Sequence, residues 1–529
     1  MLLLGLLEVP TWLVFILFLV LVYYLYTARK HSLFRRYGIP AIQPSPFIGG
    51  FPYLAKRGIM GSEYDATMKY GKVVGFFIGN MPTIFLTEPD LIRELYVKQF
   101  NNHPNRSKAA HITKFWQQTI LQTTDYNNWR FLRSTLTPAF TSGKLRKMDK
   151  IVGECVDRTI NQLKAKVTKS ENVTDMIPVF QGITLDVICQ SAMGVKLDTE
   201  SEANNELRKQ ISNLLNFSLE KNPYLLILFF IPDMKKVMEL FDIDFNDSKA
   251  VAYIKKCVDA IVKERKEDKN SEDIQDLLQL MINTNMEDKA LNEKSQTEKV
   301  LGETHGEDDD MKHAKLEKPH RGMTDDEIAA NAIMFLFAGY DTTSTAMIFT
   351  SYFLATQPEC QEKIVQEIAN NIGNSEPEYD NIQSLTYLDM FISESMRLYP
   401  PVTRINRNND FDCKVGEYTF PGGISITTPV FTLHRLPEFW PEPEKFDPER
   451  FSAENKSKIL PYTYLPFGAG PRNCVGMRFA NMELKMTMVK LLQNFRIKPS
   501  PGLQIPPKLE KHVFCRPVGG MRLILEKRK

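Results

Sequence analysis

The chain has 529 residues, of which 43% are hydrophobic and 25% charged, a composition that is typical of a folded protein and excludes a disordered one. Its 66 Lys and Arg residues nearly balance 64 Asp and Glu residues, so the net charge does not indicate nucleic-acid binding. At about 150 residues per domain, the length alone predicts three or four domains. The seven cysteines are widely spaced and form no Cys-x-x-Cys pair, which favours a reducing compartment over a disulfide scaffold or a zinc ribbon.

The first predicted element is a membrane anchor within residues 1–28. Residues 9–28 carry no charge, and as a helix they would span about 30 Å, the thickness of the hydrocarbon core of a bilayer. Trp12 lies near one end of this run and three tyrosines lie near the other, where an interfacial aromatic belt is expected. A cleaved signal peptide is the alternative, but the sequence has neither a basic segment before the run nor a small-x-small cleavage site after it.

A basic and proline-rich connector over residues 29–52 follows the anchor. Its first eight residues include four basic ones, and the positive-inside rule then leaves everything after residue 28 in the cytosol. Four prolines between residues 38 and 52 disfavour helix and predict a stiff, extended segment. Such a connector would hold the body, residues 53–529, at a set orientation to the membrane.

The body is predicted to be mainly α with a smaller β portion. Apolar and charged positions alternate at helical spacing over most of the chain up to about residue 400, and beyond Pro401 the chain becomes rich in loops. The predicted strands are 73–78, 83–87, 417–420 and 424–428, and a last hairpin is expected to turn at residues 518–520.

A highly charged tract interrupts the helical part at residues 287–320. It holds sixteen charged residues in 34 positions and almost no apolar ones, so it cannot bury enough surface to order itself. We expect a solvated or flexible loop within one body, and a domain boundary is the alternative.

The segment after this tract predicts one long helix with an unusual centre. Thr324 and Glu327 form a capping box at its start, and no proline follows until Pro358. Its centre contains Gly339 and a run of threonines, which are poor helix formers. Small residues there would let something flat lie against the backbone, and Asp341 beside a threonine could pass protons. Taken alone, a tolerated glycine with hydroxyls bonded to the preceding turn explains the pattern better.

Two further patterns have plain interpretations when each is taken alone. Glu394 and Arg397, at i and i+3, lie on one helix face and would ordinarily be a surface ion pair. Residues 446–451, Phe-Asp-Pro-Glu-Arg-Phe, indicate a proline-broken loop.

The most specific pattern is the loop over residues 467–480. Two glycines and a proline predict a tight turn, with a helix starting at or just after Cys474. A thiol at a helix N-terminus lies at the positive end of the dipole, and Arg472 adds positive charge, so both favour the thiolate. A buried structural cysteine is the alternative, but it does not require such a loop.

Together, these patterns resemble the cytochromes P-450, haem-thiolate monooxygenases, and most of all the membrane-anchored microsomal animal group that oxidises xenobiotics and steroids. The resemblance covers everything after the anchor, and the motifs occur in the order of the family. It implies the cytochrome P-450 fold, a single large haem-containing domain over residues 53–529, in place of the three or four domains expected from length. The matching motifs are Phe467-x-x-Gly470-x-Arg472-x-Cys474-x-Gly476, Glu394-x-x-Arg397, Pro448-Glu449-Arg450-Phe451 and Ala338-Gly339-x-Asp341-Thr342-Thr343.

The resemblance implies a role for each of these positions. Cys474 would be the proximal thiolate ligand of the haem iron. Asp341 and Thr342 would relay protons to dioxygen on the other haem face, and Gly339 would keep the helix close to the haem. The other loop positions implied to bind the cofactor are Phe467, Gly470, Arg472 and Gly476.

The same resemblance implies roles for charged residues, in a buried triad and in binding the haem propionates. Glu394, Arg397 and Arg450 would form a buried charge triad behind the ligand loop. Arg404 lies close to Arg407 and is an alternative to it as a partner of the haem propionates. The implied propionate partners are Trp129, Arg133, Arg407 and Arg472.

The activity implied is the insertion of one oxygen atom of O2 into an apolar small molecule. Electrons would come from NADPH through a separate flavoprotein reductase, and a small b-type cytochrome is a further implied partner. The body would face the cytosol from the endoplasmic reticulum membrane, in contact with lipid and without nucleic acid. The alternatives are a haem-thiolate isomerase or dehydratase acting on lipid peroxides, and a non-enzymatic membrane haem or lipid binder.

Three less specific regions complete the expectations. Six basic residues between positions 130 and 150 would form the face that docks the reductase, although a solvated helix surface explains them as well. The apolar segment 222–232 is either core or a patch dipping into the bilayer, and the resemblance favours the patch. The segment 103–126, with Phe115 and Trp116, would line the substrate pocket, and His434 would be structural.

Overall fold

The computed structural model describes residues 10–106, 113–167, 172–197, 202–215, 224–240, 247–268, 276–286, 321–373, 375–511 and 514–528. The charged tract 287–320 lies outside these residues, and so do parts of the segments 103–126 and 222–232.

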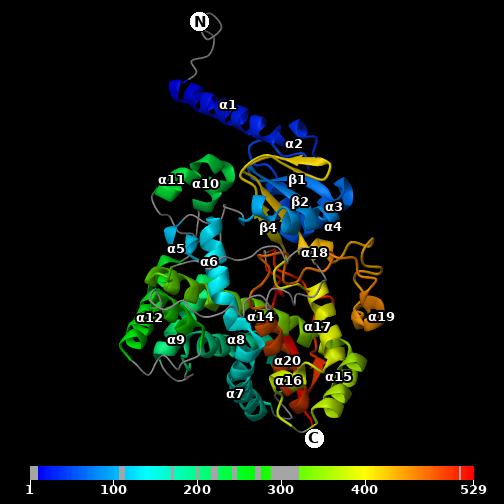
Figure 1. The fold of residues 1–529 in the computed structure, drawn as a ribbon. Coiled ribbons are helices and arrows are strands. Elements are labelled where there is room, and N and C mark those ends of the chain that lie inside the picture. Colours follow the sequence, from blue (N-terminus) through cyan, green and yellow to red (C-terminus); the bar gives the residue numbers. More distant parts are fainter. Residues whose placement is uncertain are drawn as a thin grey trace, which may run out of the picture.

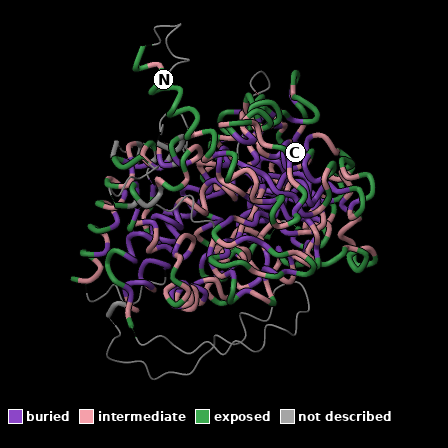
Figure 2. Tube along the Cα trace, turned by 90° about the horizontal axis from the view of Figure 1, so that it is seen from above, coloured by how far each residue is buried: buried purple, intermediate pink, exposed green. Residues whose placement is uncertain are grey.

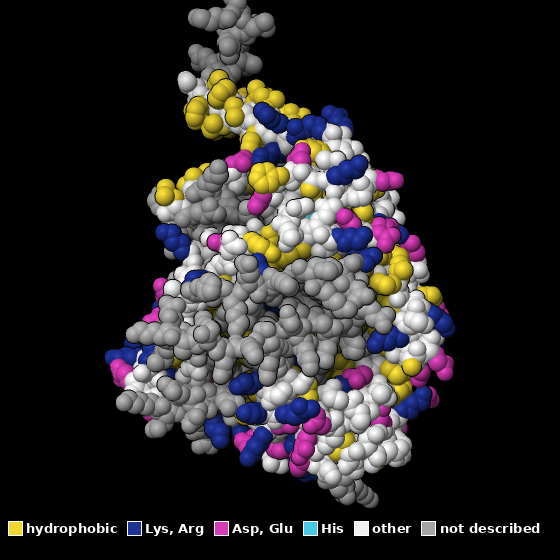
Figure 3. Space-filling model, viewed as in Figure 1, with side chains coloured by type: hydrophobic (Ala, Val, Ile, Leu, Met, Phe, Trp, Pro, Cys, Tyr) yellow, Lys and Arg dark blue, Asp and Glu magenta, His cyan; other side chains and the backbone are white. Residues whose placement is uncertain are grey.

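The N-terminal apolar segment forms helix α1, Thr11–His31, which projects away from the rest of the chain (Figure 1). Only 6% of its most apolar window is buried, with a mean hydropathy of 2.1, so α1 is long and apolar enough to cross a membrane. Figure 3 shows hydrophobic side chains covering α1 and Lys and Arg side chains gathered where it meets the body. The helices Met176–Met193 and Asp325–Thr356 are also long and apolar enough, with mean hydropathies of 1.3 and 1.2, but 72% of the most apolar window of each is buried inside the protein.

Polar contacts fix the last turns of α1 to the body. The Tyr26 hydroxyl donates to Asp233 Oδ2 at 2.6 Å, and Lys30 Nζ lies 2.9 Å from the same atom. The Tyr23 hydroxyl donates to the Phe47 carbonyl oxygen at 3.0 Å. Helix α10, Tyr224–Phe230, lies beside this junction and exposes Ile227, so the described part of the 222–232 segment presents apolar surface next to the anchor (Figure 1).

The connector has two halves with different structures. Its basic half continues as helix, because α1 runs to His31 and α2 covers Leu33–Arg36. The proline-rich half is largely non-helical, and single bridges join Ala41 to Gly75 and Gly49 to Gly79. The segment 38–52, for which we expect no helix, is non-helical up to residue 50, and α3 begins at Phe51.

Helices make up most of the body, and α14, Asp325–Thr356, runs through its centre (Figure 1). The capping box predicted at Thr324 and Glu327 is present. The other long helices are α3 Phe51–Tyr70, α6 Tyr126–Leu136, α7 Ser142–Lys166, α8 Met176–Met193, α9 Glu202–Leu215, α12 Ser248–Glu267, α13 Leu277–Met286, α15 Pro358–Asn371, α17 Thr386–Leu398 and α20 Met477–Asn494. The short helices are α4 Pro89–Arg93, α5 Lys114–Gln117, α11 Lys235–Leu240, α16 Tyr379–Ile382, α18 Val430–Leu433 and α19 Ala453–Lys456.

The described strands form three small sheets, which confirms a mainly α fold with a smaller β portion. The largest sheet has the order β1-β2-β7-β4, with β2 and β7 parallel and the other pairs antiparallel. Its strands are β1 Val73–Ile78, β2 Met81–Leu86, β7 Ser425–Thr428 and β4 Ile405–Asn408. The other strands are β3 Val173–Asp175, β9 Arg522–Lys527 and β8 Phe495–Pro499 in one sheet, and β5 Cys413–Val415 with β6 Tyr418–Phe420 in another.

The strand predictions are right except for the last hairpin. The hairpin around Gly79-Asn80 is present, and the strands near 417–420 and 424–428 are β6 and β7. Strand β9 follows the turn at residues 518–520, but it pairs with β8 and β3 and not with the residues just before the turn. The partner of β9 is distant in sequence, and a local turn signal cannot reveal it.

One hydrophobic core joins most of the helices. It extends from Phe100 to Leu525 and includes residues of α6, α7, α8, α14, α17 and α20. A second core lies against the largest sheet and is built around Phe77, Ile84 and Ile426. In the end-on view of Figure 2, the buried chain fills the centre of the molecule.

Candidate functional site

The loop over residues 467–476 is a tight turn that leads into α20. The Cys474 N–H donates to the Phe467 carbonyl oxygen at 2.9 Å, and the Asn473 N–H donates to the Gly470 carbonyl oxygen at 2.9 Å. Helix α20 begins at Met477 with Gly476 as its N-cap, so the thiol lies three residues before the helix.

Gly470 is required by the packing of this loop. Its φ is +70°, a value that favours glycine, and a Cβ built there would lie 2.0 Å from the Tyr96 carbonyl oxygen. The loop is therefore held directly against the backbone of residues 94–98, and any side chain at position 470 would push the two apart.

The Cys474 side chain is accessible to solvent. It is the one exposed cysteine of the seven, although Arg472, two residues earlier, is buried. Burial raises the pKa of the Cys474 thiol, whereas a hydrogen bond from the Gly476 N–H and the charge of Arg133 lower it. A thiol that solvent can reach inside the body is available to bind a ligand.

Three arginines from distant parts of the chain converge on this loop, which contributes a fourth, Arg472. Arg133 of α6 donates to the Asn473 carbonyl oxygen at 2.9 Å and to its side-chain oxygen at 2.7 Å. Arg106 donates to the Arg472 carbonyl oxygen at 3.2 Å. Arg407 of β4 reaches the Ala469 carbonyl oxygen at 3.4 Å. The Arg472 guanidinium lies 4.8 Å from the centre of the Trp129 ring.

These arginines have no carboxylate partner among the described residues. Burial lowers the pKa of Arg133 and of Arg407 to about 10 each, and burial together with the other three arginines lowers the pKa of Arg472 to about 8. The Arg472 Nε and Nη1 atoms are buried without a hydrogen-bond partner. Because buried cations without a counter-charge are strongly destabilising, this cluster fits anionic groups of a ligand beside the thiol.

Helix α14 is less buried at the segment that the sequence singled out. Beyond its exposed first turn at Asp325 and Asp326, the helix is buried, except that residues 337–340, Thr342 and the last residue, Thr356, are half-buried. The Thr342 hydroxyl donates to the Ala338 carbonyl oxygen at 2.7 Å, the bonding to the preceding turn expected as the alternative. Asp341 is buried and forms an ion pair with Arg516 at 2.9 Å.

Gly339 permits close packing of α14 against α8. A Cβ at Gly339 would lie 2.9 Å from Ile188 Cδ1, and the Thr184 hydroxyl of α8 donates to the Tyr340 carbonyl oxygen at 2.9 Å. The missing side chain thus points towards α8.

The predicted charge triad is assembled behind the loop. Arg397 and Glu394 of α17 are fully buried and lie 2.7 Å apart, and Arg450 Nε lies 3.4 Å from Glu394. Arg397 also donates to the His434 carbonyl oxygen at 2.9 Å. His434 Nε2 accepts from the Leu465 N–H at 2.8 Å, so this histidine is a structural bridge as expected.

The comparisons with known proteins decide the family. The family model described as Cytochrome P450 matches residues 40–525. The chain belongs to the cytochrome P450 family. It is 34% identical over 524 residues to "Cytochrome P450 3A12" of Canis lupus familiaris, covering 98% of this chain and 97% of that protein. It is 35% identical to "Cytochrome P450 3A29" of Sus scrofa, with 96% and 95% covered, and 34% identical to "Cytochrome P450 3A5" of Homo sapiens, with 97% and 95% covered.

Membership makes this cytochrome P450 a monooxygenase of the oxidoreductase class, with haem held by a cysteine thiolate. The residues present fit that group. The accessible thiol of Cys474 can supply the ligand. The arginines around it, which have no carboxylate partner among the described residues, can bind the two carboxylates of a haem.

The structure separates Arg407 from its alternative, Arg404. The Arg404 guanidinium forms an ion pair with the buried carboxylate of Glu63, so its charge is already balanced. The Arg407 guanidinium lies over the Tyr96 ring, 4.4 Å from its centre. Like Arg106, Arg133 and Arg472, it has no carboxylate partner among the described residues. The geometry therefore favours Arg407 as the partner of an anionic ligand.

Arg106 is the member of the cluster that sequence reasoning missed. It follows Asn105, which forms a single bridge with Asn408, and it lies within the segment expected to line the pocket. No motif contains it. Only a contact with residue 472, more than 360 positions later, brings it to the site.

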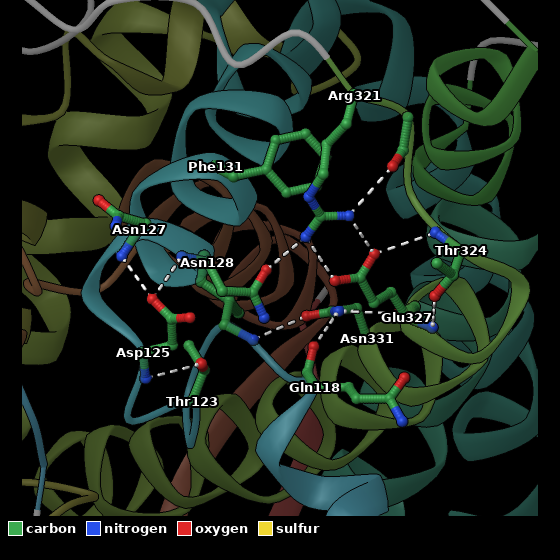
Figure 4. Close-up of polar contacts among 12 residues, drawn as sticks. Gln118, Thr123, Asp125, Asn127, Asn128, Phe131, Arg321, Thr324, Glu327 and Asn331 are labelled. Atoms are coloured by element: carbon green, nitrogen blue, oxygen red, sulfur yellow. Dashed lines mark hydrogen bonds and ion pairs between the residues drawn. The ribbon is translucent and has the colours of Figure 1, made fainter. Parts of the chain in front are cut away.

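A polar network fixes the segment that we expect to line the pocket to the start of α14 (Figure 4). The Asn331 side chain accepts from the Ile120 N–H at 2.8 Å and donates to the Gln118 carbonyl oxygen at 3.0 Å. Arg321 pairs with Glu327 at 2.7 Å and lies 4.0 Å from the centre of the Phe131 ring. Residues 118–131 are therefore anchored to α14 at several points.

The basic stretch between positions 130 and 150 is only partly a surface feature. Arg133 points into the arginine cluster, whereas Arg146, Lys147 and Lys150 of α7 are exposed. Arg146 forms an ion pair with Asp380 at 2.9 Å. The exposed basic surface thus belongs to α7.

Proposed function

We propose that this cytochrome P450 uses O2 and electrons from NADPH to hydroxylate apolar small molecules such as xenobiotics, steroids or fatty acids. The supporting observation is the reachable thiol of Cys474 beside four arginines without acid partners. A haem held by the Cys474 thiolate would supply O2 activation, with one oxygen atom going to the substrate and the other to water.

Each predicted site residue has a task in this proposal. Cys474 ligates the iron as the thiolate, and the turn around Phe467, Gly470 and Gly476 holds it in place. Asp341 moves protons from solvent to Thr342, whose hydroxyl must turn away from the Ala338 carbonyl oxygen to donate to dioxygen. Gly339 keeps this part of α14 close to its neighbours. The partners proposed for the propionates are Trp129, Arg133, Arg407 and Arg472, and we add Arg106.

The proposal extends to location and partners. Residues 1–28 anchor the chain in the endoplasmic reticulum membrane, residues 29–52 connect the anchor, and residues 53–529 form one catalytic domain in the cytosol. The exposed side chains of Ile227 in α10 and of Ile231 just after it, near the C-terminal end of α1, dip into the bilayer. A flavoprotein reductase docks on the basic surface of α7, and a small b-type cytochrome is a second electron donor.

The proposal is tested by reconstituting the full chain with haem, a flavoprotein reductase and phospholipid vesicles. We expect NADPH-dependent oxygenation of apolar compounds that bind and shift the Soret band, with one 18O atom from 18O2 in each product. Isomerisation of a lipid hydroperoxide without NADPH, together with no NADPH-driven oxygenation across the screened compounds, would overturn it.

Replacing Arg472 by glutamine should weaken haem retention. The guanidinium is buried among like charges, so its loss relieves repulsion in the haem-free protein and removes a charge-assisted bond in the loaded one. We expect haem transfer to apomyoglobin to accelerate about tenfold to a hundredfold, because a hydrogen bond to a charged group contributes about 1.5–3 kcal/mol. Arg146→Gln, which removes an exposed guanidinium, is the control and should transfer haem at the wild-type rate.

A further inference from the structure

The ion pair between Asp341 and Arg516 joins the centre of α14 to the C-terminal segment. Arg516 Nη2 lies 2.9 Å from Asp341 Oδ2. In the described part of the chain, no other Lys, Arg or His lies within ion-pair distance of that carboxylate. No sequence motif includes Arg516, which lies 175 positions after its partner.

Both ends of this ion pair are held by the backbone. On α14, packing at Gly339 and the hydrogen bond between Thr184 and the Tyr340 carbonyl oxygen fix the helix against α8. On the other side, the Glu510 N–H donates to the Arg516 carbonyl oxygen at 2.9 Å, and a bridge joins Val402 to Phe514. The carboxylate therefore has little freedom while Arg516 is in place.

The two side chains of the pair differ in their exposure to solvent. The Asp341 side chain is 7% exposed and the Arg516 side chain is 24% exposed. Solvent reaches the arginine and barely reaches the acid. Because arginine keeps its proton in proteins, it cannot itself relay one. What it can do is hold Asp341 Oδ2 and leave Oδ1 for proton transfer.

We infer that Arg516 is a positioning residue for proton delivery, one that orients the Asp341 carboxylate towards Thr342. This inference rests on the proposed function. Productive turnover consumes a substrate RH, O2, two electrons from NADPH through the reductase and two protons, and it yields ROH and water. When proton delivery is misdirected, the same two electrons and two protons reduce O2 to hydrogen peroxide, and RH is left unchanged. The Asp341 carboxylate accepts a proton from solvent and passes it on towards Thr342, so its net charge is restored in each cycle.

The test compares Arg516→Gln with Arg516→Lys in the reconstituted full chain. We expect Arg516→Gln to form product about tenfold to a hundredfold more slowly, because misplacing a proton-transfer group has effects of this size. NADPH oxidation should continue with hydrogen peroxide as its main product, the carbon monoxide spectrum should stay unchanged, and the solvent deuterium isotope effect on product formation should change. Arg516→Lys should recover most of the coupling. Arg522→Gln, an exposed arginine on β9, is the matched control and should behave as wild type.

Two further measurements separate positioning from a loss of fold. In a double-mutant cycle, Arg516→Gln should have no additional effect on coupling in an Asp341→Asn background. In the substrate-free ferric protein, hydrogen exchange of residues 514–518 should accelerate in Arg516→Gln and in Asp341→Asn alike.

Unchanged coupling or unchanged hydrogen exchange in Arg516→Gln overturns this inference. Wild-type protein that shows no NADPH-dependent oxygenation overturns the proposed function instead, and the hydrogen-exchange result then still reports whether the ion pair holds the C-terminal segment.

Discussion

Replacing Cys474 by serine should abolish the strongly red-shifted Soret band of the reduced carbon monoxide complex and reduce NADPH-dependent oxygenation to background. Cys474 is the one exposed cysteine of the seven, and it lies in a turn that hydrogen bonds and Gly470 fix in place. A serine hydroxyl fits the same space, but it donates far less electron density to iron than a thiolate does. The substitution therefore changes the chemistry of the ligand and leaves the loop intact.

The matched control is Cys257→Ser on α12, where the cysteine lies outside the ligand loop. This variant should keep both the spectrum and the activity. Circular dichroism of Cys474→Ser should match wild type, because every backbone hydrogen bond of the turn remains. A red-shifted band that survives in Cys474→Ser would assign the thiolate to another cysteine and overturn the proposed site.

The features that sequence analysis predicted well are those whose partners are close in sequence. The capping box at Thr324 and Glu327 and the hairpin around Gly79-Asn80 depend on contacts over a few residues, and both are present. The pair Glu394 and Arg397 is also local. The complete burial of this pair could not be predicted from spacing, which alone predicts a surface ion pair. Only the family resemblance implies a buried charge triad.

The features that sequence analysis missed depend on long-range contacts. Arg106, the pairing of Arg404 with Glu63 and the pairing of Asp341 with Arg516 each join residues that are more than 170 positions apart. Periodicity shows that a residue lies on a helix face, but it does not show what packs there. For the same reason the sequence could not reveal that the missing Cβ of Gly339 faces Ile188.

The arginine cluster shows how charge refines a resemblance. The family pattern suggested Trp129, Arg133, Arg407 and Arg472, with Arg404 as an alternative, on position alone. In the structure, Arg404 is balanced by Glu63, whereas Arg407 and its neighbours have no acid among the described residues. The balance of charge, and not the motif, therefore distinguishes two arginines that lie three positions apart.

Replacing Glu394 by glutamine should lower the free energy of unfolding by about 3–5 kcal/mol, the range observed when one member of a buried ion pair is removed. Glu394 receives two hydrogen bonds from Arg397 at 2.7 and 2.8 Å and one from the Asp447 N–H at 2.9 Å. Burial raises the pKa of this carboxyl, and the two arginines of the triad oppose that shift. Glutamine keeps the shape of the side chain but leaves Arg397 buried without a counter-charge.

The matched control is the same substitution at an exposed position, Glu362→Gln. Glu362 pairs with Arg496 at 2.6 Å, but both side chains are nearly half exposed, so we expect a loss of about 1 kcal/mol or less. Urea unfolding of the haem-loaded protein, followed by the loss of the Soret band, measures both variants under one condition. Because Glu394 contacts Asp447 and Arg450 and not the ligand turn over residues 467–476, the residual folded Glu394→Gln protein should keep the red-shifted carbon monoxide band. Equal unfolding midpoints for the two variants would mean that the triad does not stabilise the fold, and loss of the band in folded protein would mean that it acts on the thiolate directly.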